Sequence, residues 1–499
     1  MAQQSVLTTT QTTRQEQKNS APLPRWMRYF FIQETAQDQR KIADLQRRAV
    51  WIALALILLS LNEIDHGWYF PFLGPVASLI PLFLLLGCFA SVWMALRTRK
   101  PEASRTRQPF PTRGQRVVLI LTLILSIAGF IQFGRGIIMC FLPPEFSNDG
   151  TTLDTNAAML LVDGRNPYTD SNMLDIFRNQ HFELQPSWTT PLRQGQFADR
   201  LDYPSEPEIR SVLNTALKAG EAPEFESRVS YPALSFLTLL PFALLNTYNV
   251  LPFYILSYLL IIFVAWKAVH PALRPWALLL AMANIPMWAS TVGGNLDIFC
   301  ALLVILAWLF KDSRWLSGLF LGLAIATKQT SWFLVPFYFI MIFRNYDLKE
   351  TLHRGSIAAA VALVFNLPFF LWDPQAFVAG VLAPIADPMF PMGIGIINLS
   401  VTKLIPFLPE KVYTVVEGLT MLGTLALYWR ISRKAPEAAL LLAFVPLVFA
   451  WRSLPSYFYC IAFPIYIVMG ARINPALEKF SLIAWARRLV RTTQVPAHA

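Results

Sequence analysis

Charged residues are scarce in this chain. Asp, Glu, Lys and Arg make up 15% of its 499 residues, whereas a soluble domain carries about 25%. Hydrophobic residues make up 55%, and many of them lie in unbroken runs long enough to cross a bilayer. The composition therefore predicts an all-α polytopic membrane protein. The net charge of +11 does not indicate a nucleic-acid partner, because the basic residues cluster between apolar runs, where they retain loops on the cytoplasmic side.

Cysteine and histidine are rare as well. Neither a CxxC motif nor a zinc-like Cys/His spacing occurs, and the cysteines all lie inside or at the ends of apolar runs: Cys88, Cys140, Cys300 and Cys460. Four of the five histidines, His66, His181, His270 and His353, form no metal-spaced set. A Walker pattern, a nucleotide fingerprint and a Ser/His/Asp grouping are also missing. We therefore expect no cofactor, and no divalent metal is indicated, although one remains compatible with the sequence.

The N-terminus has no apolar h-region and is not a signal peptide. Its Gln- and Thr-rich start predicts a disordered tail of about 24 residues, and the RWMRYFFIQ stretch that follows is compatible with an amphipathic surface helix. We assign residues 1–48 to a cytoplasmic tail, 49–116 to two additional spans with a basic loop, and 472–499 to a basic cytoplasmic tail.

The junctions between apolar runs predict the topology. Residues 97–116 hold seven basic residues and one acidic residue, so this loop is expected inside, which places loops 143–230 and 373–411 outside. Only one net crossing separates 143–230 from the basic junction at 267–274, yet two apolar runs lie there. We infer that 231–246 does not fully cross; an outward-facing 267–274 is the less favoured alternative. The prediction is a bundle of about 12 spans with both termini inside.

This topology brings several polar stretches to the outer face. They are the stretch FSNDGTTLD with Asp149 and Asp154, the turn GGNLD (293–297), the turn ATKQTS (326–331), residues 372–400 and WRSLP (451–455). Polar residues at the ends of short helices can converge on one external cavity, and charges at membrane depth usually face such a cavity.

Each of these residues has a structural and a functional interpretation. Asp149 is either a turn aspartate or a catalytic base, and Asp154 looks like the N-cap of a helix that ends near Gly164. Lys328 either extends to the membrane interface or binds a phosphate. The same choice applies to Arg452, and Asp297 either caps a helix or contacts substrate.

In their order along the chain, these residues resemble the GT-C class of multispanning glycosyltransferases, with the nearest likeness to family 87, which includes polyprenol-phosphate-mannose-dependent mannosyltransferases. The resemblance spans about residues 117–471. It is carried by an acidic residue past an early span (Asp149) and a G-x-NPY helix end (Gly164 to Tyr168). A YP-x-L…P stretch (Tyr231, Pro232 and Pro241) and a GN-x-D turn (Gly294, Asn295 and Asp297) follow. The last motif is a G-x-x-x-G-x-A-x-x-x-K stretch (Gly318, Gly322, Ala324 and Lys328). The chain differs in its two extra N-terminal spans, its longer first outer loop and its lack of an adjacent acidic pair, so metal dependence is not implied.

The resemblance implies transfer of a sugar, a mannose-like hexose or a pentose, from a polyprenyl-phosphate donor. The acceptor is expected to be an extracytoplasmic glycolipid, glycan or protein hydroxyl. A phosphate leaves without a general acid, so one carboxylate is sufficient as base, and a one-step displacement inverts the anomeric carbon. The resemblance favours Asp149 as the base with Asp154 in reserve. Cationic side chains suit the donor phosphate, and the candidates are Lys328, Arg452 and Arg165. Supporting contacts are expected from Asp297, Asn295, Tyr168 and Tyr231.

The family also implies a multi-pass protein of the cell membrane, in bacteria the inner membrane, with an extracytoplasmic active site that serves the cell envelope. The sequence itself leaves an endoplasmic reticulum membrane open. The alternative function is a transporter or flippase of lipid-linked sugars. Such proteins often carry internal repeats, but no second copy of the opening motif occurs here.

Overall fold

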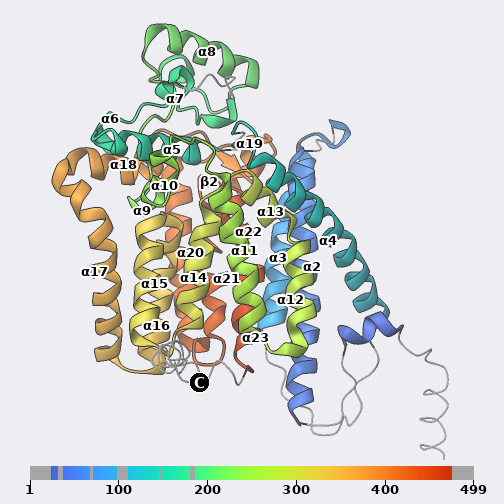
Figure 1. Ribbon diagram of the computed structural model, residues 1–499. Coiled ribbons are helices and arrows are strands. Elements are labelled where there is room, and N and C mark those ends of the chain that lie inside the picture. The colour runs from blue at the N-terminus through green and yellow to red at the C-terminus, as the bar shows by residue number, and fades with distance from the viewer. Residues whose placement is uncertain are drawn as a thin grey trace, which may run out of the picture.

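The computed structural model describes residues 24–31, 37–67, 71–97, 111–144, 146, 148–179 and 186–474. Most of the predicted disordered tail, most of the basic loop 97–116 and the C-terminal tail from 475 lie outside the described residues. The described chain is mostly helical, and its helices stand side by side in a bundle with a smaller group of elements at one end (Figure 1).

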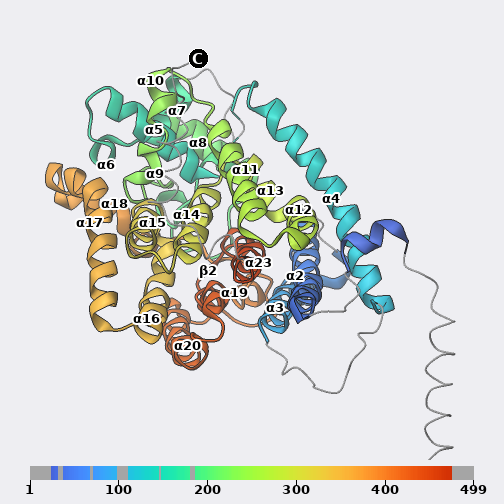
Figure 2. The same ribbon diagram turned by 60° about the horizontal axis from the view of Figure 1, so that its bottom comes forward.

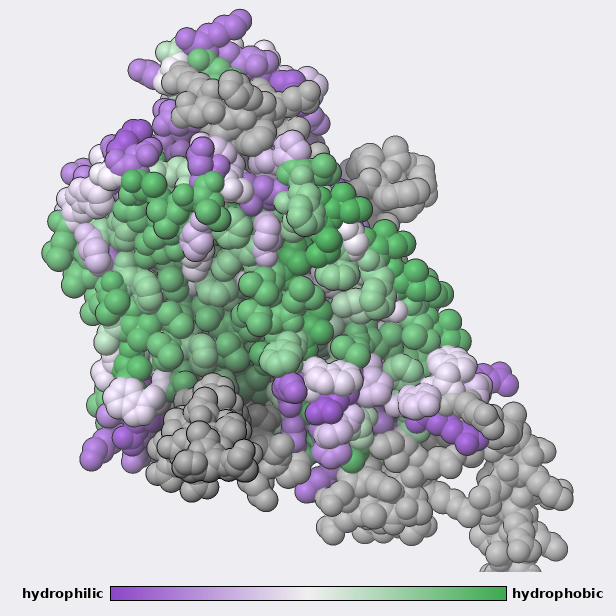
Figure 3. Space-filling view, in the orientation of Figure 1, coloured by the Kyte–Doolittle hydropathy of each residue, from purple (hydrophilic) through white to green (hydrophobic). Residues whose placement is uncertain are grey.

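Five helical segments are long and apolar enough to cross a membrane by length and composition: Gly74–Leu96, which contains α3 (Leu79–Leu96), α4 (Arg113–Met139), α11 (Leu251–Ala268), α17 (Leu348–Trp372) and α20 (Glu410–Ile431). Shorter helices fill the bundle between them: α12 (Arg274–Ala283), α13 (Ile285–Val292), α14 (Asp297–Leu309), α15 (Arg314–Thr327), α16 (Val335–Asn345), α21 (Ala439–Leu442), α22 (Ser456–Tyr459) and α23 (Ala462–Ala471). On the face seen in Figure 3, an apolar belt lies between two polar ends, as in a membrane protein. The predicted count of about 12 spans stays a prediction.

Short elements form a cap at the upper end in Figure 1. They comprise α5 (Asp149–Val162), α6 (Pro167–Asp170), α7 (Met173–Asn179), α8 (Glu206–Ala219), α9 (Leu234–Leu237), α10 (Leu240–Leu244), α18 (Pro374–Ala386), α19 (Ile397–Val401) and the parallel two-residue strands β1 (Met392–Gly393) and β2 (Arg452–Ser453). The remaining elements besides α2 are short 3-10 helices: η1 (Arg25–Tyr29), η2 (Pro71–Ser78), η3 (Pro186–Trp188), η4 (Gly195–Phe197), η5 (Pro271–Leu273), η6 (Gln329–Leu334), η7 (Pro436–Ala438) and η8 (Pro446–Phe449). Sequence segments 143–230 and 373–411 thus gather at one end of the bundle.

The apolar segment 231–246 folds as the short helices α9 and α10, of four and five residues. Neither is long enough to cross a bilayer, which takes about 20 residues. Both lie beside α5 in the cap, since α5 contacts α9 and α10. The structure thus agrees with the inference that this segment does not fully cross, and its predicted place at the outer interface stays a prediction.

The first long helix begins earlier than the sequence suggested. Helix α2 (Gln37–Gly67) includes twelve residues that we had assigned to the N-terminal tail. These turns are polar, and an Asp44–Arg48 ion pair of 2.7 Å at i,i+4 spacing supports their helical form. The predicted amphipathic helix around residue 27 is the 3-10 turn η1, with Met27 buried.

The two additional N-terminal helices pack on the rest of the bundle. Helix α2 contacts α3, α4, α12 and α23, and in Figure 2 it lies among them. At its upper end the Tyr459 hydroxyl donates to Glu63, and the Asn398 side chain donates to the Ser78 carbonyl at 3.3 Å. The N-terminal helices therefore support α22 and α19, which belong to the cap end of the bundle.

A close approach of α4 to α12 gives a test of this packing. A Cβ added at Gly129 would stand 1.7 Å from the Met282 carbonyl oxygen, whereas one added at Gly134, on the same helix, would meet nothing within 4 Å. Gly129→Ala should lower the thermal unfolding midpoint of the detergent-solubilised protein, because overpacking costs about 1–3 kcal/mol. Gly134→Ala should leave the midpoint unchanged or raise it slightly, since alanine favours helix. Equal midpoints for the two variants would contradict this helix contact.

Candidate functional site

The N-terminus of α5 is attached to the turn at 293–295. The Asn148 side chain caps α5 by accepting from the Thr151 N–H at 2.9 Å, and its amide donates to the Gly293 carbonyl at 3.1 Å. The Thr151 hydroxyl donates to the Gly294 carbonyl, and Gly294 has the left-handed conformation that the turn requires (φ 76°). Two stretches 145 residues apart in sequence therefore meet at one point.

This cap corrects the interpretation of the opening motif. Asp154 lies inside α5 and does not begin it, so its predicted capping role is wrong; Asn148 is the cap, and Asp149 is the first helical residue. An Asn followed at once by an acidic residue is itself an N-terminal signal, because the carboxylate favours the positive end of the helix dipole. The helix ends as expected, with Gly164 in the left-handed conformation after it (φ 72°).

Asp149 is partly exposed at the start of α5. Its Oδ1 accepts from the Gly150 N–H at 2.9 Å, and the Thr190 hydroxyl donates to its Oδ2. Its electrostatic neighbours include Tyr203 and Tyr231. The carboxylate is thus oriented by two donors and still reaches solvent, as a base that receives a proton from an incoming molecule must.

A second carboxyl group, which we did not predict from the sequence, lies against Asp149. Glu226 is 5% exposed, its N–H donates to the Thr190 carbonyl at 2.9 Å, and its side chain is within hydrogen-bonding reach of Asp149. Burial and the neighbouring Asp149 raise the pKa of Glu226 well above its usual value. An acidic pair therefore exists in space although the sequence shows none.

Lys328 and Asp297 form a buried ion pair. Lys328 Nζ lies 3.0 Å from Asp297 Oδ1, with side chains 8% and 7% exposed. The ammonium also lies 4.9 Å from the ring centroid of Tyr231. Lys328 interrupts the helical path between α15 and η6, and Asp297 opens α14 with its N–H donating to Asn295 Oδ1 at 3.0 Å. Lys328 therefore does not extend to the membrane interface, and its charge is already partnered.

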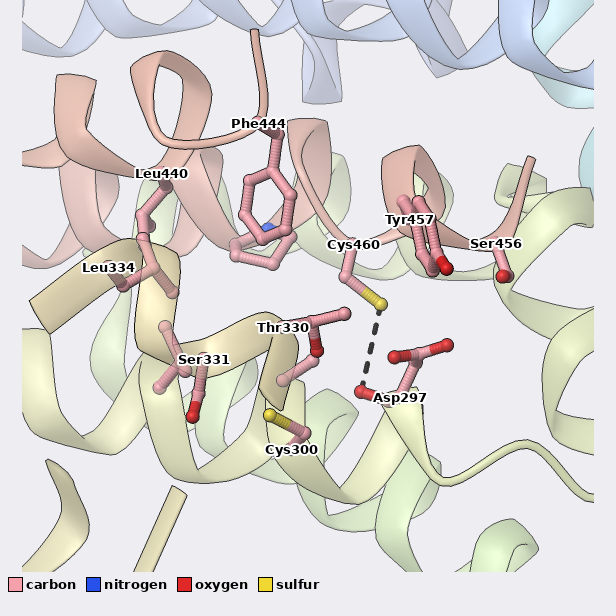
Figure 4. Close-up of a pocket in the computed structure, with 13 residues that line it drawn as sticks. Asp297, Cys300, Thr330, Ser331, Leu334, Leu440, Phe444, Ser456, Tyr457 and Cys460 are labelled. Carbon is pink, nitrogen blue, oxygen red and sulfur yellow. Dashed lines mark hydrogen bonds between the residues drawn. The ribbon is translucent and has the colours of Figure 1, made fainter. Parts of the chain in front are cut away.

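A cavity opens beside this pair. Its polar lining comes from Asp297, Thr330, Ser331, Ser456 and Tyr457, with cysteines and apolar residues around them (Figure 4). Tyr457 interacts electrostatically with Arg452, Lys328, Asp297 and Asp149. Tyr457 thus lies among the charged groups that the sequence analysis predicted separately, and it was not itself predicted.

Arg452, on β2, differs from Lys328 in having no acidic partner. Its Nη1 and Nη2 lie 2.9 and 3.5 Å from the sulfur atoms of Met389 and Met392. Within the described parts of the chain, no carboxylate is within ion-pair distance of it, and its buried Nε has no hydrogen-bond partner. Arg165, by contrast, is half exposed and pairs with Asp170 at 3.4 Å, at the far end of α5 from Asp149. Arg452 is therefore the guanidinium available to an anion.

Two further candidates, Tyr168 and Asp154, make structural contacts beside the site. The Tyr168 hydroxyl donates to the Tyr231 carbonyl at 2.7 Å, and its ring packs against Phe236, Phe369 and Phe377. Asp154 is fully buried, accepts from the Ser235 hydroxyl at 2.7 Å and leaves Oδ2 without a partner in the described structure. Burial raises the pKa of Asp154 to about 7.

No group of three or more His, Cys, Asp or Glu residues arranged to hold a metal occurs in the residues that the structure describes.

The raised pKa of Asp154 predicts a pH-dependent stability. The folded protein binds this proton more tightly than the unfolded chain, so folding loses stability as the pH rises from 3.8 to about 7 and loses no more above that. Asp154→Asn should remove this loss, so the variant's unfolding midpoint should gain on the parental one across this window. Midpoints measured from pH 4 to 8, with Asp163→Asn at the exposed end of α5 as the control, test this. Parallel curves for parent and Asp154→Asn would contradict it.

The comparison with protein families agrees with this arrangement. The model of glycosyltransferase family 87 matches residues 230–455, a region that includes Tyr231, Asp297, Lys328 and Arg452 but not Asp149 or Glu226. No curated protein and no solved structure matches the chain. The match confirms the resemblance drawn from the sequence motifs: over residues 230–455 the chain is similar to glycosyltransferase family 87, which indicates a membrane glycosyltransferase.

Proposed function

We propose that this glycosyltransferase moves a sugar from a polyprenyl-phosphate donor to a hydroxyl group of an extracytoplasmic glycolipid, glycan or protein. The sugar is a mannose-like hexose or a pentose. The observation that carries the proposal is the position of Asp149, which is solvent-reachable, is oriented by Thr190 and Gly150, and interacts electrostatically with Tyr457, as Arg452 and Lys328 also do. The large loops gathered there suit a site on the outer face of the cell membrane.

Asp149 acts as the general base. As the acceptor oxygen forms its bond to the anomeric carbon, the hydroxyl proton passes to Asp149, and the bond from that carbon to the phosphate oxygen breaks with its electron pair on the phosphate. The displacement inverts the anomeric centre. No acid is needed for the leaving group, because the lipid phosphate leaves as a stable anion.

Arg452 is the main ligand of the donor phosphate. Its guanidinium has no carboxylate to satisfy it and offers paired N–H donors that match phosphate oxygens. Lys328, held by Asp297, contributes positive potential to the cavity and, with Tyr457, links the two cations. We further propose that these cations serve in place of a metal, so the assays below include a chelator.

Asp149→Asn should abolish transfer from a polyprenyl-phosphate sugar, with a loss of about 10²–10⁴-fold, because the amide has no basic oxygen and general-base catalysis contributes about that much. Asp163→Asn, at the other end of the same helix, should retain the parental rate. The measurement is the initial rate with synthetic donor in EDTA, at matched unfolding midpoints. Parental rates for Asp149→Asn, and for Asp154→Asn as well, would refute the proposed base, whereas an absence of transfer by the parental protein itself would favour the transporter interpretation.

Arg452→Gln should weaken donor use. Loss of a charged hydrogen bond to the phosphate should raise the KM for donor about tenfold or more and lower kcat, because charge-assisted bonds contribute about 1.5–3 kcal/mol. Arg165→Gln removes a guanidinium from the same end of the molecule whose charge is already paired at the surface, and should leave both constants unchanged. If Arg165→Gln raises the KM and Arg452→Gln does not, the phosphate site has been assigned to the wrong arginine.

A further inference from the structure

Glu226 stands in an unusual position for a carboxyl group. It is buried beside the partly exposed Asp149, it is near Arg452 without pairing with it, and its Oε1 has no hydrogen-bond partner within the described residues. A carboxylate placed so would lose its hydration and gain little beyond the Ser230 hydroxyl in exchange, whereas a neutral carboxylic acid can remain there and donate a hydrogen bond of its own.

The chain around Glu226 fixes it against Asp149 through one shared residue. Thr190 accepts from the Glu226 N–H with its carbonyl and donates to Asp149 Oδ2 with its hydroxyl. Pro191 and Phe225 form an antiparallel bridge next to this point, and the Leu192 N–H donates to the Glu224 carbonyl at 2.8 Å. The two carboxyl groups are therefore brought together by paired backbone, and not by a chance contact of long side chains.

We propose that Glu226 is a positioning residue for the base: it stays protonated and donates a hydrogen bond to Asp149, so that the pair holds a single negative charge. This rests on the proposed function. The donated hydrogen bond occupies one lone pair of Asp149 and directs another toward the acceptor hydroxyl. A neutral Glu226 also leaves the Arg452 guanidinium uncompensated, which keeps it available for the donor phosphate.

The proton balance of the step is simple. Before transfer the pair holds one proton, on Glu226. The acceptor hydroxyl gives its proton to Asp149 as the new C–O bond forms and the phosphate leaves with its electron pair, so the pair then holds two protons. Asp149, which reaches solvent, returns its proton to water, and Glu226 keeps its own.

The groups that surround the pair come from several elements and bear on its titration. They are Arg452 on β2, Tyr203 in the loop before α8, Tyr231 before α9, Tyr457 on α22 and the buried Asp154 on α5. Burial and Asp149 oppose ionisation of Glu226, while the hydrogen bond from Ser230 and the charge of Arg452 favour it. At alkaline pH Glu226 ionises, the donated hydrogen bond is lost, and two like charges face each other.

Rate–pH profiles of two variants test this. Parental transfer should decline at alkaline pH. Glu226→Gln keeps an N–H donor at every pH and should hold its rate where the parental rate declines, and Glu226→Ala should lose about tenfold or more at all pH values, because a positioned general base contributes about 10²–10⁴-fold. Glu224→Gln is the matched control, because Glu224 lies two residues away in the same buried segment and accepts from the Gln196 N–H; its profile should follow the parental one.

An alkaline decline in Glu226→Gln identical to the parental one, or a parental rate in Glu226→Ala, would overturn the inference. Unfolding midpoints of all variants separate a folding defect from a catalytic one. The result with Asp149→Asn distinguishes the two levels of the proposal. If that variant is inactive while Glu226→Gln titrates like the parent, only the role of Glu226 fails; if Asp149→Asn and Asp154→Asn both transfer at the parental rate, the proposed base itself fails and the role of Glu226 fails with it.

Discussion

The constraint on which the rest of this structure depends is the satisfaction of backbone groups at helix ends that stop short of the membrane surface. In an apolar medium each unpaired N–H or C=O group costs several kcal/mol, so a broken helix needs side chains to complete it. The site region is built from such ends. Ser331 donates to the Ala324 and Lys328 carbonyls at 2.9 and 2.8 Å, and Gln329 donates to the Ser230 and Val381 carbonyls at 2.6 and 2.8 Å. These bonds join the break after α15 to the outer loop and to α18, so the same contacts that complete the backbone also assemble the site.

The cationic residues at this end of the bundle are of two kinds, one paired with a carboxylate and one not. Lys328 and Asp297 neutralise each other at 3.0 Å, which fixes the break after α15 against the start of α14. A buried pair of this sort is weak evidence of stabilisation but strong evidence of a fixed geometry, because removal of either partner leaves an uncompensated charge. The Nη groups of Arg452 contact methionine sulfur atoms, and no carboxylate in the described residues is within ion-pair distance of it, so its charge is left for an outside anion. The structure thus separates the cation that holds the site together from the one that is open to a ligand.

The sequence predicted those features of the fold and the site that depend on residues close together in the chain. Apolar runs, basic junctions and the turn residues of FSNDG and GGNLD predicted the helical bundle, the break at 231–246 and the gathering of polar residues at one end. It did not predict those features that depend on contacts between segments far apart in the chain. Glu226 lies in a polar loop, 77 residues after Asp149, without a motif around it, and only the bridge between Pro191 and Phe225 brings it to the base. The pairing of Lys328 with Asp297 and the sulfur environment of Arg452 likewise follow from helix packing, which no spacing in the sequence encodes.

The two aspartates of α5 illustrate how environment assigns different roles to one residue type. Asp154 is fully buried and accepts a hydrogen bond from Ser235, and burial raises its pKa to about 7. Its protonation is therefore set mainly by the protein interior around it. Asp149 is exposed enough to meet an acceptor, and its orientation is fixed by Thr190 and by the backbone of its own helix turn. A base must exchange protons with molecules that arrive from outside, and Asp154 has no route to them. The burial of Asp154 therefore argues against it as the base as strongly as the position of Asp149 argues for that residue. The two carboxylates of one helix thus differ in role because one is at its exposed start and the other is buried.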